Sequence, residues 1–218
     1  MNIGEWLPRL WQASLTTVYM VGVSTLFTVV FGLPLGVLLM ITGENGLKTR
    51  PVLNRVLGFV VNLARSLPFI ILLVVLIPFT RALVGTSIGP TATIVPLTLA
   101  AVPFFARVVE SSLREVPRGL IEAAQSMGSS DWQTVRKVLI PESLPGLILG
   151  VALTLISLVG YSAMAGAVGG GGLGDLAIRY GYQRYETEVM IVTVVLLLIL
   201  VQGVQLLGDR LAAKVSKK

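Results

Sequence analysis

The sequence contains no cysteine and no histidine in its 218 residues. Without cysteine there are no disulfide bonds, thiolate metal sites or cysteine nucleophiles. Without histidine the chain lacks the most common proton shuttle and metal ligand. Charged residues are also scarce, at 13% of the chain. Because most familiar enzyme chemistries lose their reagents, we expect no catalytic residue, no metal site and no cofactor.

Hydrophobic residues are abundant instead: they make up 54% of the sequence, and its mean hydropathy is +0.85. A soluble domain of this length cannot cover so much apolar surface, which indicates a protein embedded in membrane lipid. The net charge is +6, but the basic residues flank apolar runs and form no stripe with interleaved aromatic residues. Nucleic acid is therefore not an expected partner.

Five apolar windows are each long enough to cross a hydrocarbon core, which takes about 20 helical residues. In lipid only helices and closed barrels satisfy their backbone groups, and these runs lack the alternation of barrel strands. The first window is too long for a signal-peptide core, so we expect it to be retained. The sequence predicts an all-α polytopic membrane protein, a single domain over residues 1–218, with transmembrane helices at Leu10–Gly43, Val56–Thr80, Ala82–Ala106, Ser143–Gly174 and Val189–Gly208.

Five spans place the two termini on opposite sides of the membrane, and the basic residues indicate which side faces the cytoplasm. The side of the C-terminus would carry Lys48, Arg50, Arg55, Arg107, Arg114, Arg118, Arg136, Lys137, Arg210, Lys214, Lys217 and Lys218. The other side would carry only Arg9, Arg81, Arg179 and Arg184. Since basic residues concentrate on the cytoplasmic side, we expect a cytoplasmic C-terminus and an N-terminus outside.

A long segment rich in ionisable residues, 107–142, separates the third and fourth windows. Its first half predicts a short amphipathic helix, with Pro117 in the first turn and a left-handed cap at Gly128. Ser130 and Gln133 form a capping-box pattern that begins a second helix, which Pro141 should end. The apolar residues at helical spacing are Leu120, Ile121, Ala124 and Met127 in the first helix, and Trp132, Val135, Val138 and Leu139 in the second.

The same segment carries a recognisable motif: Glu122-Ala123-Ala124, three residues, Gly128, nine residues, then Val138-Leu139-Ile140-Pro141. It resembles the EAA loop of ABC-importer permeases, from which it departs only in having Val138 and Ile140 where Ile and Leu are common. The resemblance implies a coupling helix that docks into a groove of a cytoplasmic ATPase through Glu122, Ala123, Ala124, Gly128 and Pro141. The alternative is an ordinary solvated helical hairpin.

The resemblance extends to most of the chain. The stretches Arg65–Leu73, Ile77–Arg81, Val84–Gly89 and Gly160–Met164 are similar to the permease subunits of methionine importers. This similarity implies a homodimer in the bacterial cytoplasmic (inner) membrane, two copies of a separate ATPase, and an extracytoplasmic substrate-binding protein or lipoprotein. A permease for another amino acid or a quaternary amine would share much of the pattern, so the substrate stays open.

Three further features have both a functional and a structural interpretation. Tyr161, Ser162 and Met164 are suited to an outer gate for a thioether substrate, or simply pack between helices. Arg65 either makes a packing or gating contact inside the membrane or extends to its cytoplasmic boundary. The glycines of Gly166–Gly174 form either a flexible extracytoplasmic connection that contacts a binding protein or a plain turn.

Two other classes of function compete with transport. An intramembrane hydrolase needs a nucleophile and a base in contact, and Ser162 lies outside any G-x-S-x-G elbow. A membrane scaffold would explain the spans without requiring the loop motif. Gly46-Leu47-Lys48-Thr49 lacks the Gly-Lys pair of a phosphate loop, so ATP hydrolysis is expected on a partner chain.

Overall fold

The computed structural model describes residues 3–44 and 46–216, so Lys217 and Lys218 of the charge count lie outside the described residues. Within these ranges the chain forms helices and no strands. In chain order they are α1 (Ile3–Thr42), α2 (Pro51–Ser66), α3 (Phe69–Val75), α4 (Ile77–Val84), α5 (Pro90–Arg114), α6 (Arg118–Ser126), α7 (Asp131–Thr134), the π-helical η1 (Val135–Leu139), α8 (Ile140–Glu142), α9 (Leu144–Gly166), α10 (Gly172–Leu176), the π-helical η2 (Ala177–Tyr182) and α11 (Thr187–Val215).

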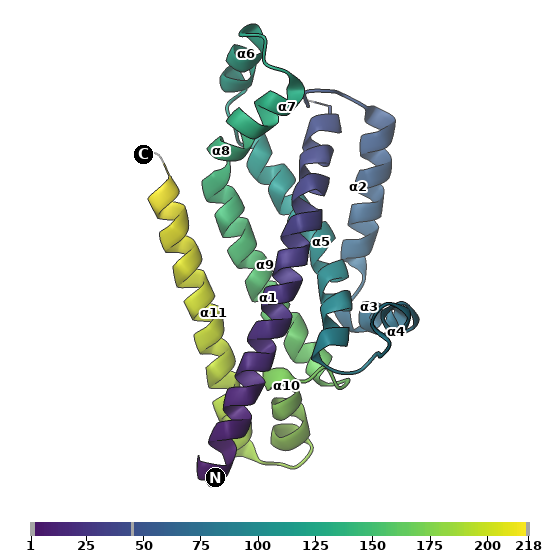
Figure 1. Cartoon of the computed structure of the whole chain (residues 1–218), viewed down its shortest axis with the longest axis vertical. Coiled ribbons are helices and arrows are strands. Elements are labelled where there is room, and N and C mark those ends of the chain that lie inside the picture. The colour runs from purple at the N-terminus through teal and green to yellow at the C-terminus, as the bar shows by residue number, and fades with distance from the viewer. Residues whose placement is uncertain (1–2, 45, 217–218) are drawn as a thin grey trace.

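The long helices run lengthwise between two ends of one bundle. Figure 1 shows α6 and the C-terminal end of α11 at one end, called here the loop end, and the N-terminus at the opposite end. Among the described residues, α1, α5, α9 and α11 are long and apolar enough to cross a membrane. The pair α2–α3 passes the same test together, with a bend of 102° between its two parts. The expected all-α fold with five passages is confirmed.

Two of the expected windows have the wrong shape. The second is broken after Ser66, because Pro68 disfavours helical geometry at the residue before it, and Leu67 is extended (ψ 128°). The third begins at Pro90, not Ala82, since Gly85 and Gly89 adopt positive φ (83° and 102°) and separate α4 from α5. A hydropathy window does not register these backbone breaks.

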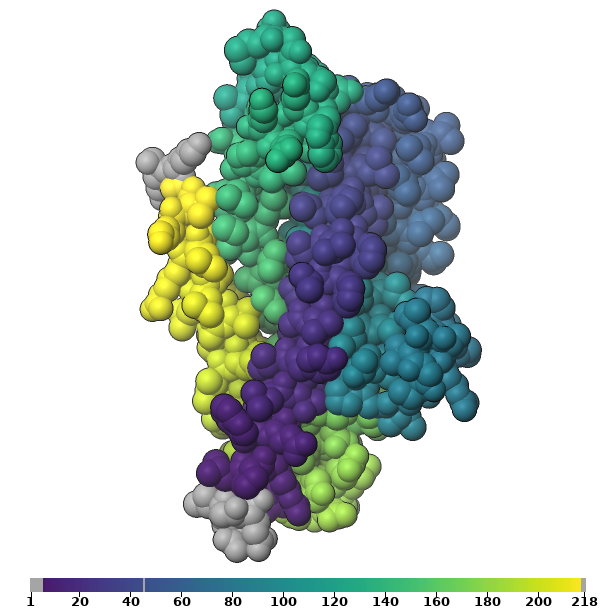
Figure 2. All heavy atoms as spheres, viewed as in Figure 1, coloured from purple at the N-terminus to yellow at the C-terminus, as the bar shows by residue number. Residues whose placement is uncertain are grey.

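The core is built around α5, which packs along α1, α9 and α2. Close approach of α1 to α5 depends on glycine: a Cβ at Gly32 would lie 2.9 Å from Cδ1 of Phe105, and one at Gly36 would lie 2.6 Å from Cβ of Val109. Phe105 and Val109 belong to a buried apolar cluster near the loop end. In contrast, α11 packs mainly on α9 among the long helices and stands at the outside of the bundle (Figure 2).

The glycine-rich segment 166–174 is packed against the bundle and includes a turn at residues 167–169. The expectation of a flexible connection is therefore wrong, the expected turn accounts for part of the segment, and contact with a binding protein stays a prediction. The fourth span ends at Gly166 instead of Gly174, and α10 begins within the segment at Gly172. A Cβ at Gly170 would lie 2.8 Å from the carbonyl oxygen of Ala165. The Leu173 N–H donates to Oγ1 of Thr17 on α1 over 2.9 Å. The glycines therefore allow close helix contacts here.

Candidate functional site

The loop that carries the motif begins later than expected. Arg107, Glu110 and Arg114 are the last two turns of α5 and not part of the excursion. The chain leaves the bundle at Glu115, and α6 starts at Arg118 with Pro117 as its N-cap residue. The expectation that Pro117 lies in the first helical turn is therefore wrong by one position, because its extended backbone (ψ 129°) precedes the helix.

The end of α6 has the geometry expected from Gly128. Its φ of +81° is left-handed, a conformation that glycine adopts at little cost. The Gly128 N–H donates to the carbonyl of Gln125 (2.9 Å), and the Ser129 N–H donates to the carbonyl of Ala124 (3.1 Å). These two bonds form a Schellman motif, which satisfies carbonyls that a helix end leaves free. The predicted left-handed cap is confirmed, and it sets the angle between α6 and the next helix.

The second helix starts as expected and then continues further. The Gln133 N–H donates to Oγ of Ser130 and the Ser130 N–H donates to Oε1 of Gln133, which completes the capping box. Pro141 does not end the helix, because η1 runs directly into α8 and the helix continues to Glu142. In η1 the Ile140 N–H bonds the carbonyl of Val135. This wider turn accommodates a proline in the following helical turn.

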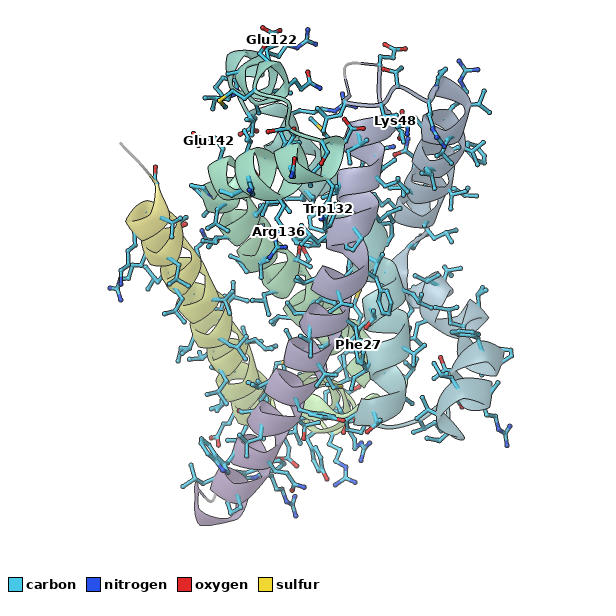
Figure 3. All side chains as sticks on the ribbon, turned by 45° about the horizontal axis from the view of Figure 1, so that its top comes forward. Phe27, Lys48, Glu122, Trp132, Arg136 and Glu142 are labelled. Atoms are coloured by element: carbon cyan, nitrogen blue, oxygen red, sulfur yellow. The ribbon has the colours of Figure 1, made fainter. Side chains whose placement is uncertain are left out.

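The loop has a buried base and an exposed tip. At the base, Val135 and Leu139 are buried in the same apolar cluster as Val109. At the tip, Glu122 and Ala123 are exposed and only Ala124 is buried, on the side where α6 packs on η1 and α7. Figure 3 shows Glu122 at the outermost point of the molecule. The motif residues thus meet on one exposed helix and its elbow, while Pro141 lies apart at the base.

Large apolar side chains at the tip remain uncovered. Met127 is 81% exposed and Trp132 67% exposed, and Leu120 is also exposed. Helical spacing predicts amphipathic helices with these residues on their apolar faces, and in the structure Leu120, Met127 and Trp132 of those faces are exposed. Their spacing is compatible with burial against another chain, which a single sequence does not distinguish from burial within its own fold.

Beneath the loop, a charge network escaped the sequence analysis. Glu110 is only 4% exposed and accepts from Arg107 at 2.7 Å and from Arg114 at 2.6 Å. Arg107 also donates to the carbonyl of Gly58 and to Oδ1 of Asn62, both at 3.0 Å. The network therefore ties α2 to α5 at the foot of the loop. The sequence does contain an indication of this network, because Arg107, Glu110 and Arg114 have the i, i+3 and i+7 spacing that puts them on one face of a helix.

The candidate gate residues divide between two faces of α9. The Tyr161 ring stacks on Phe69 with centroids 4.7 Å apart, and Met164 is exposed one turn further along the same face. Ser162 is buried, and its hydroxyl donates to the carbonyl of Val159 at 2.8 Å. Tyr161 and Met164 lie together near the end of the bundle opposite the loop. Ser162 is on another face of α9, and its hydroxyl is already hydrogen-bonded to a carbonyl of the same helix.

Arg65 packs against a neighbouring helix, which is one of the two roles that the sequence leaves open for it. Its guanidinium carbon lies 6.0 Å from the centroid of the Phe104 ring on α5. Arg65, Phe69, Phe104 and Tyr161 line one cavity of about 130 Å³. The arginine therefore lies beside the candidate gate, far along α2 from the loop end.

Comparison with known proteins gives consistent matches over nearly the whole chain. The family model described as "Binding-protein-dependent transport system inner membrane component" matches residues 32–217. The probable D-methionine transport system permease protein MetI of Vibrio cholerae is 54% identical over 100% of this chain and 95% of its own length. The methionine import system permease protein MetP of Bacillus subtilis is 46% identical over 97% of this chain and 96% of its own.

Solved structures match equally well. A chain of the MetNI methionine ABC transporter in an inward-facing conformation is 51% identical, with a TM-score of 0.96 over 98% of this chain and 99% of that one. A chain of an amino acid ABC transporter crystallised with histidines has a TM-score of 0.79 at 19% identity over 98% of this chain and 97% of that one, which is a likeness of fold alone.

Proposed function

Since the chain belongs to the family of binding-protein-dependent transport system inner membrane components, we propose that it is the permease subunit of an ATP-driven methionine importer. The observation that carries this proposal is the near-complete likeness in sequence and fold to a chain of a solved methionine ABC transporter. Two copies of the permease form the pathway, two copies of a separate ATPase hydrolyse ATP, and a substrate-binding protein or lipoprotein delivers methionine. The chain itself is not an enzyme.

The exposed tip of the loop is the surface that contacts the ATPase. Glu122 and Ala123 are exposed on α6, Met127 is exposed at the end of that helix, and Trp132 is exposed on α7. Exposed methionine and tryptophan side chains are typical of a surface that a partner covers, and an exposed carboxylate such as Glu122 suits pairing with a basic residue of that partner. The Schellman elbow at Gly128 and the buried base at Val135 hold this surface in a fixed position relative to the spans.

A fixed loop matters for coupling. ATP binding and hydrolysis change the permease conformation only if the ATPase interacts with different free energy with each state. A loop joined to the bundle by buried contacts transmits that difference, whereas a mobile one loses it. The Arg107–Glu110–Arg114 network extends the connection from the foot of the loop to α2.

The orientation follows from the charges at the two ends. Lys48, Arg50, Arg118, Arg136 and Lys214 all belong to segments at the loop end, while Arg9 and Arg179 belong to the opposite end (Figure 1). The positive-inside rule therefore puts the loop end and the C-terminus in the cytoplasm and the N-terminus outside. Tyr161 and Met164 then lie toward the outer side, where they contribute to a gate for the thioether side chain of methionine.

Transport in a reconstituted system tests this function. The full chain, its ATPase and its binding protein are placed in vesicles, and uptake of labelled methionine, histidine, glutamine and glycine betaine is compared with and without ATP. We expect ATP-dependent uptake of methionine well above the other three compounds. Preferred uptake of another amino acid or of the quaternary amine would refute methionine as the substrate. A complex that assembles with the ATPase but transports none of the four compounds would favour the alternative function of a membrane scaffold.

A further inference from the structure

An apolar groove on the side of the bundle away from the candidate gate has no role in the function proposed above. It has a volume of about 490 Å³ and lies between α1 and α11, with α9 as its floor. Figures 1 and 2 show the C-terminal part of α11 standing apart from α1 toward the loop end. The residues that define the groove here are Val29 and Leu33 of α1, Leu144 and Leu155 of α9, and Leu207 and Leu211 of α11.

At the floor of the groove, α9 and α11 approach each other closely. A Cβ at Gly208 would lie 2.6 Å from Cβ of Ala152, so the two helices meet there at two of the smallest residues. The lining is almost entirely apolar, and such a groove in a membrane protein is filled by hydrocarbon.

The length of the groove corresponds to one leaflet of a bilayer. The lining residues of α9 extend from Leu144 to Leu155, which is about 16 Å along a helix. Half of a hydrocarbon core is about 15 Å. The groove therefore has room for the acyl chain of a lipid from the leaflet at the loop end.

Basic side chains surround the mouth of this groove. Arg136 precedes the lining residue Ile140 by one helical turn, and Lys214 follows the lining residue Leu211 by one turn, so each is on the groove face of its helix. In Figure 3, Arg136 extends toward the space between α1 and α11. Lys137 and Arg210 add two more exposed cations nearby.

The charge balance at the mouth favours an anion. Among residues 3–44 and 46–216, no recorded salt bridge involves Arg136, Lys137, Arg210 or Lys214. The acidic groups nearby are Glu142 and Asp209, and Asp209 accepts a hydrogen bond from Gln205 at 2.9 Å. These segments thus carry four cations and two carboxylates, and basic pockets between spans on the cytoplasmic side bind anionic headgroups.

We infer that the groove between α1 and α11 is a binding site for an anionic phospholipid of the cytoplasmic leaflet. Its acyl chain lies along α9, and its phosphate lies between Arg136 and Lys214. The assignment to that leaflet rests on the orientation in the proposed function. The lipid site itself is tested without methionine or ATP, so its failure is distinguishable from failure of the transport function.

Lipid retention tests the charge requirement. The full chain, purified with its ATPase and stripped of lipid, is incubated with equal amounts of phosphatidylglycerol and phosphatidylcholine of identical chains, and bound lipid is measured by native mass spectrometry. We expect a preference for phosphatidylglycerol that falls by about five-fold per cation removed, thus by about 25-fold in R136Q/K214Q. The matched control R50Q/R55Q removes two exposed cations of the same end, remote from the groove, and should keep the preference. Equal retention of both lipids by the unmodified chain would refute the site.

A second pair of variants tests whether the acyl chain of the lipid lies in the groove. Leu207 lines it and is 60% exposed, whereas Leu198 is 56% exposed on the same helix and is not among the lining residues. Leu207→Trp should lower retention of both lipids, and Leu198→Trp should not. A photoreactive amino acid at Leu207, activated in native membranes, identifies the occupant directly. A phospholipid adduct supports the proposal, whereas an adduct with a second copy of the chain, or with neither, overturns it.

Discussion

Gly128 tests whether the bend between α6 and α7 couples the ATPase to the transmembrane helices. Its φ of +81° requires the left-handed region, and a Cβ built there would meet no atom within 4 Å. The Cβ of a substituted residue therefore finds open space, and the main effect of a substitution here is on the backbone conformation. A non-glycine residue in this conformation costs about 1–2 kcal/mol, and a β-branched residue costs at least about 2 kcal/mol.

A cost of about 2 kcal/mol lowers the population of the native elbow relative to alternatives about 30-fold. The spans are untouched, so Gly128→Val should insert and accumulate normally while its ATPase associates more weakly or hydrolyses ATP without transport. Gly128→Asn should retain most function, because asparagine tolerates the left-handed region. The measurements are copurification of the ATPase with the tagged chain and the ratio of methionine transported to ATP hydrolysed.

Gly119 offers the matched control within the same loop. A Cβ there also meets nothing within 4 Å, but Gly119 lies inside α6 with ordinary helical backbone. Gly119→Ala should stabilise α6 by about 1 kcal/mol, whereas Gly128→Ala should destabilise its cap. If Gly128→Val binds the ATPase and transports at the unmodified rate, the elbow is not part of the coupling element.

Three other outcomes follow from the same description. Glu122→Lys should weaken ATPase association by reversing an exposed charge, while Glu115→Lys, exposed outside the motif, should not; equal effects of the two would contradict a specific contact. Glu110→Ala should destabilise the folded chain by about 1–3 kcal/mol, because Arg107 and Arg114 lose a hydrogen-bonded carboxylate but are themselves 26% and 58% exposed, so water takes over part of its role. Glu110→Gln should lose less. Thermal melting of the purified complex compares the two variants, and an unchanged melting temperature for both would be inconsistent with the network. Single cysteines in place of the exposed Gln125 and Gln183 should label from opposite sides of the membrane, since the native chain has no cysteine; labelling from the same side would refute the proposed orientation.

The sequence predicted the features that depend on neighbouring residues. The cap at Gly128 and the capping box at Ser130 are local, because their hydrogen bonds join residues at most five apart. Hydropathy likewise found the five passages, because it sums over many residues. The same sum missed the break at Pro68, since Leu67 and Phe69 on either side are as apolar as a continuous span would require.

The sequence does not predict features that depend on contacts with distant segments or with other chains. The partner of Arg107 on α2 is set by packing, because Asn62 is 45 residues away. For the glycines after Gly166 the sequence leaves a flexible connection and a plain turn equally open, since nothing in a single sequence says that another backbone lies against them. One sequence likewise does not say which chain covers Met127 and Trp132, because the periodicity of a covered face is the same whichever chain covers it.

The break between α2 and α3 also bears on how the chain enters the membrane during synthesis. With 16 residues, α2 is about 24 Å long, which is shorter than a hydrocarbon core of about 30 Å. The side-chain amide of Asn54 donates to the carbonyl of Leu39 on α1, and α1 is synthesised before α2. In contrast, Asn62 and the carbonyl of Gly58 accept from Arg107 on α5, and α5 is synthesised after α2. We therefore expect α2 to be a marginal segment at the translocon, and to reach its final depth only after α5 has been translated.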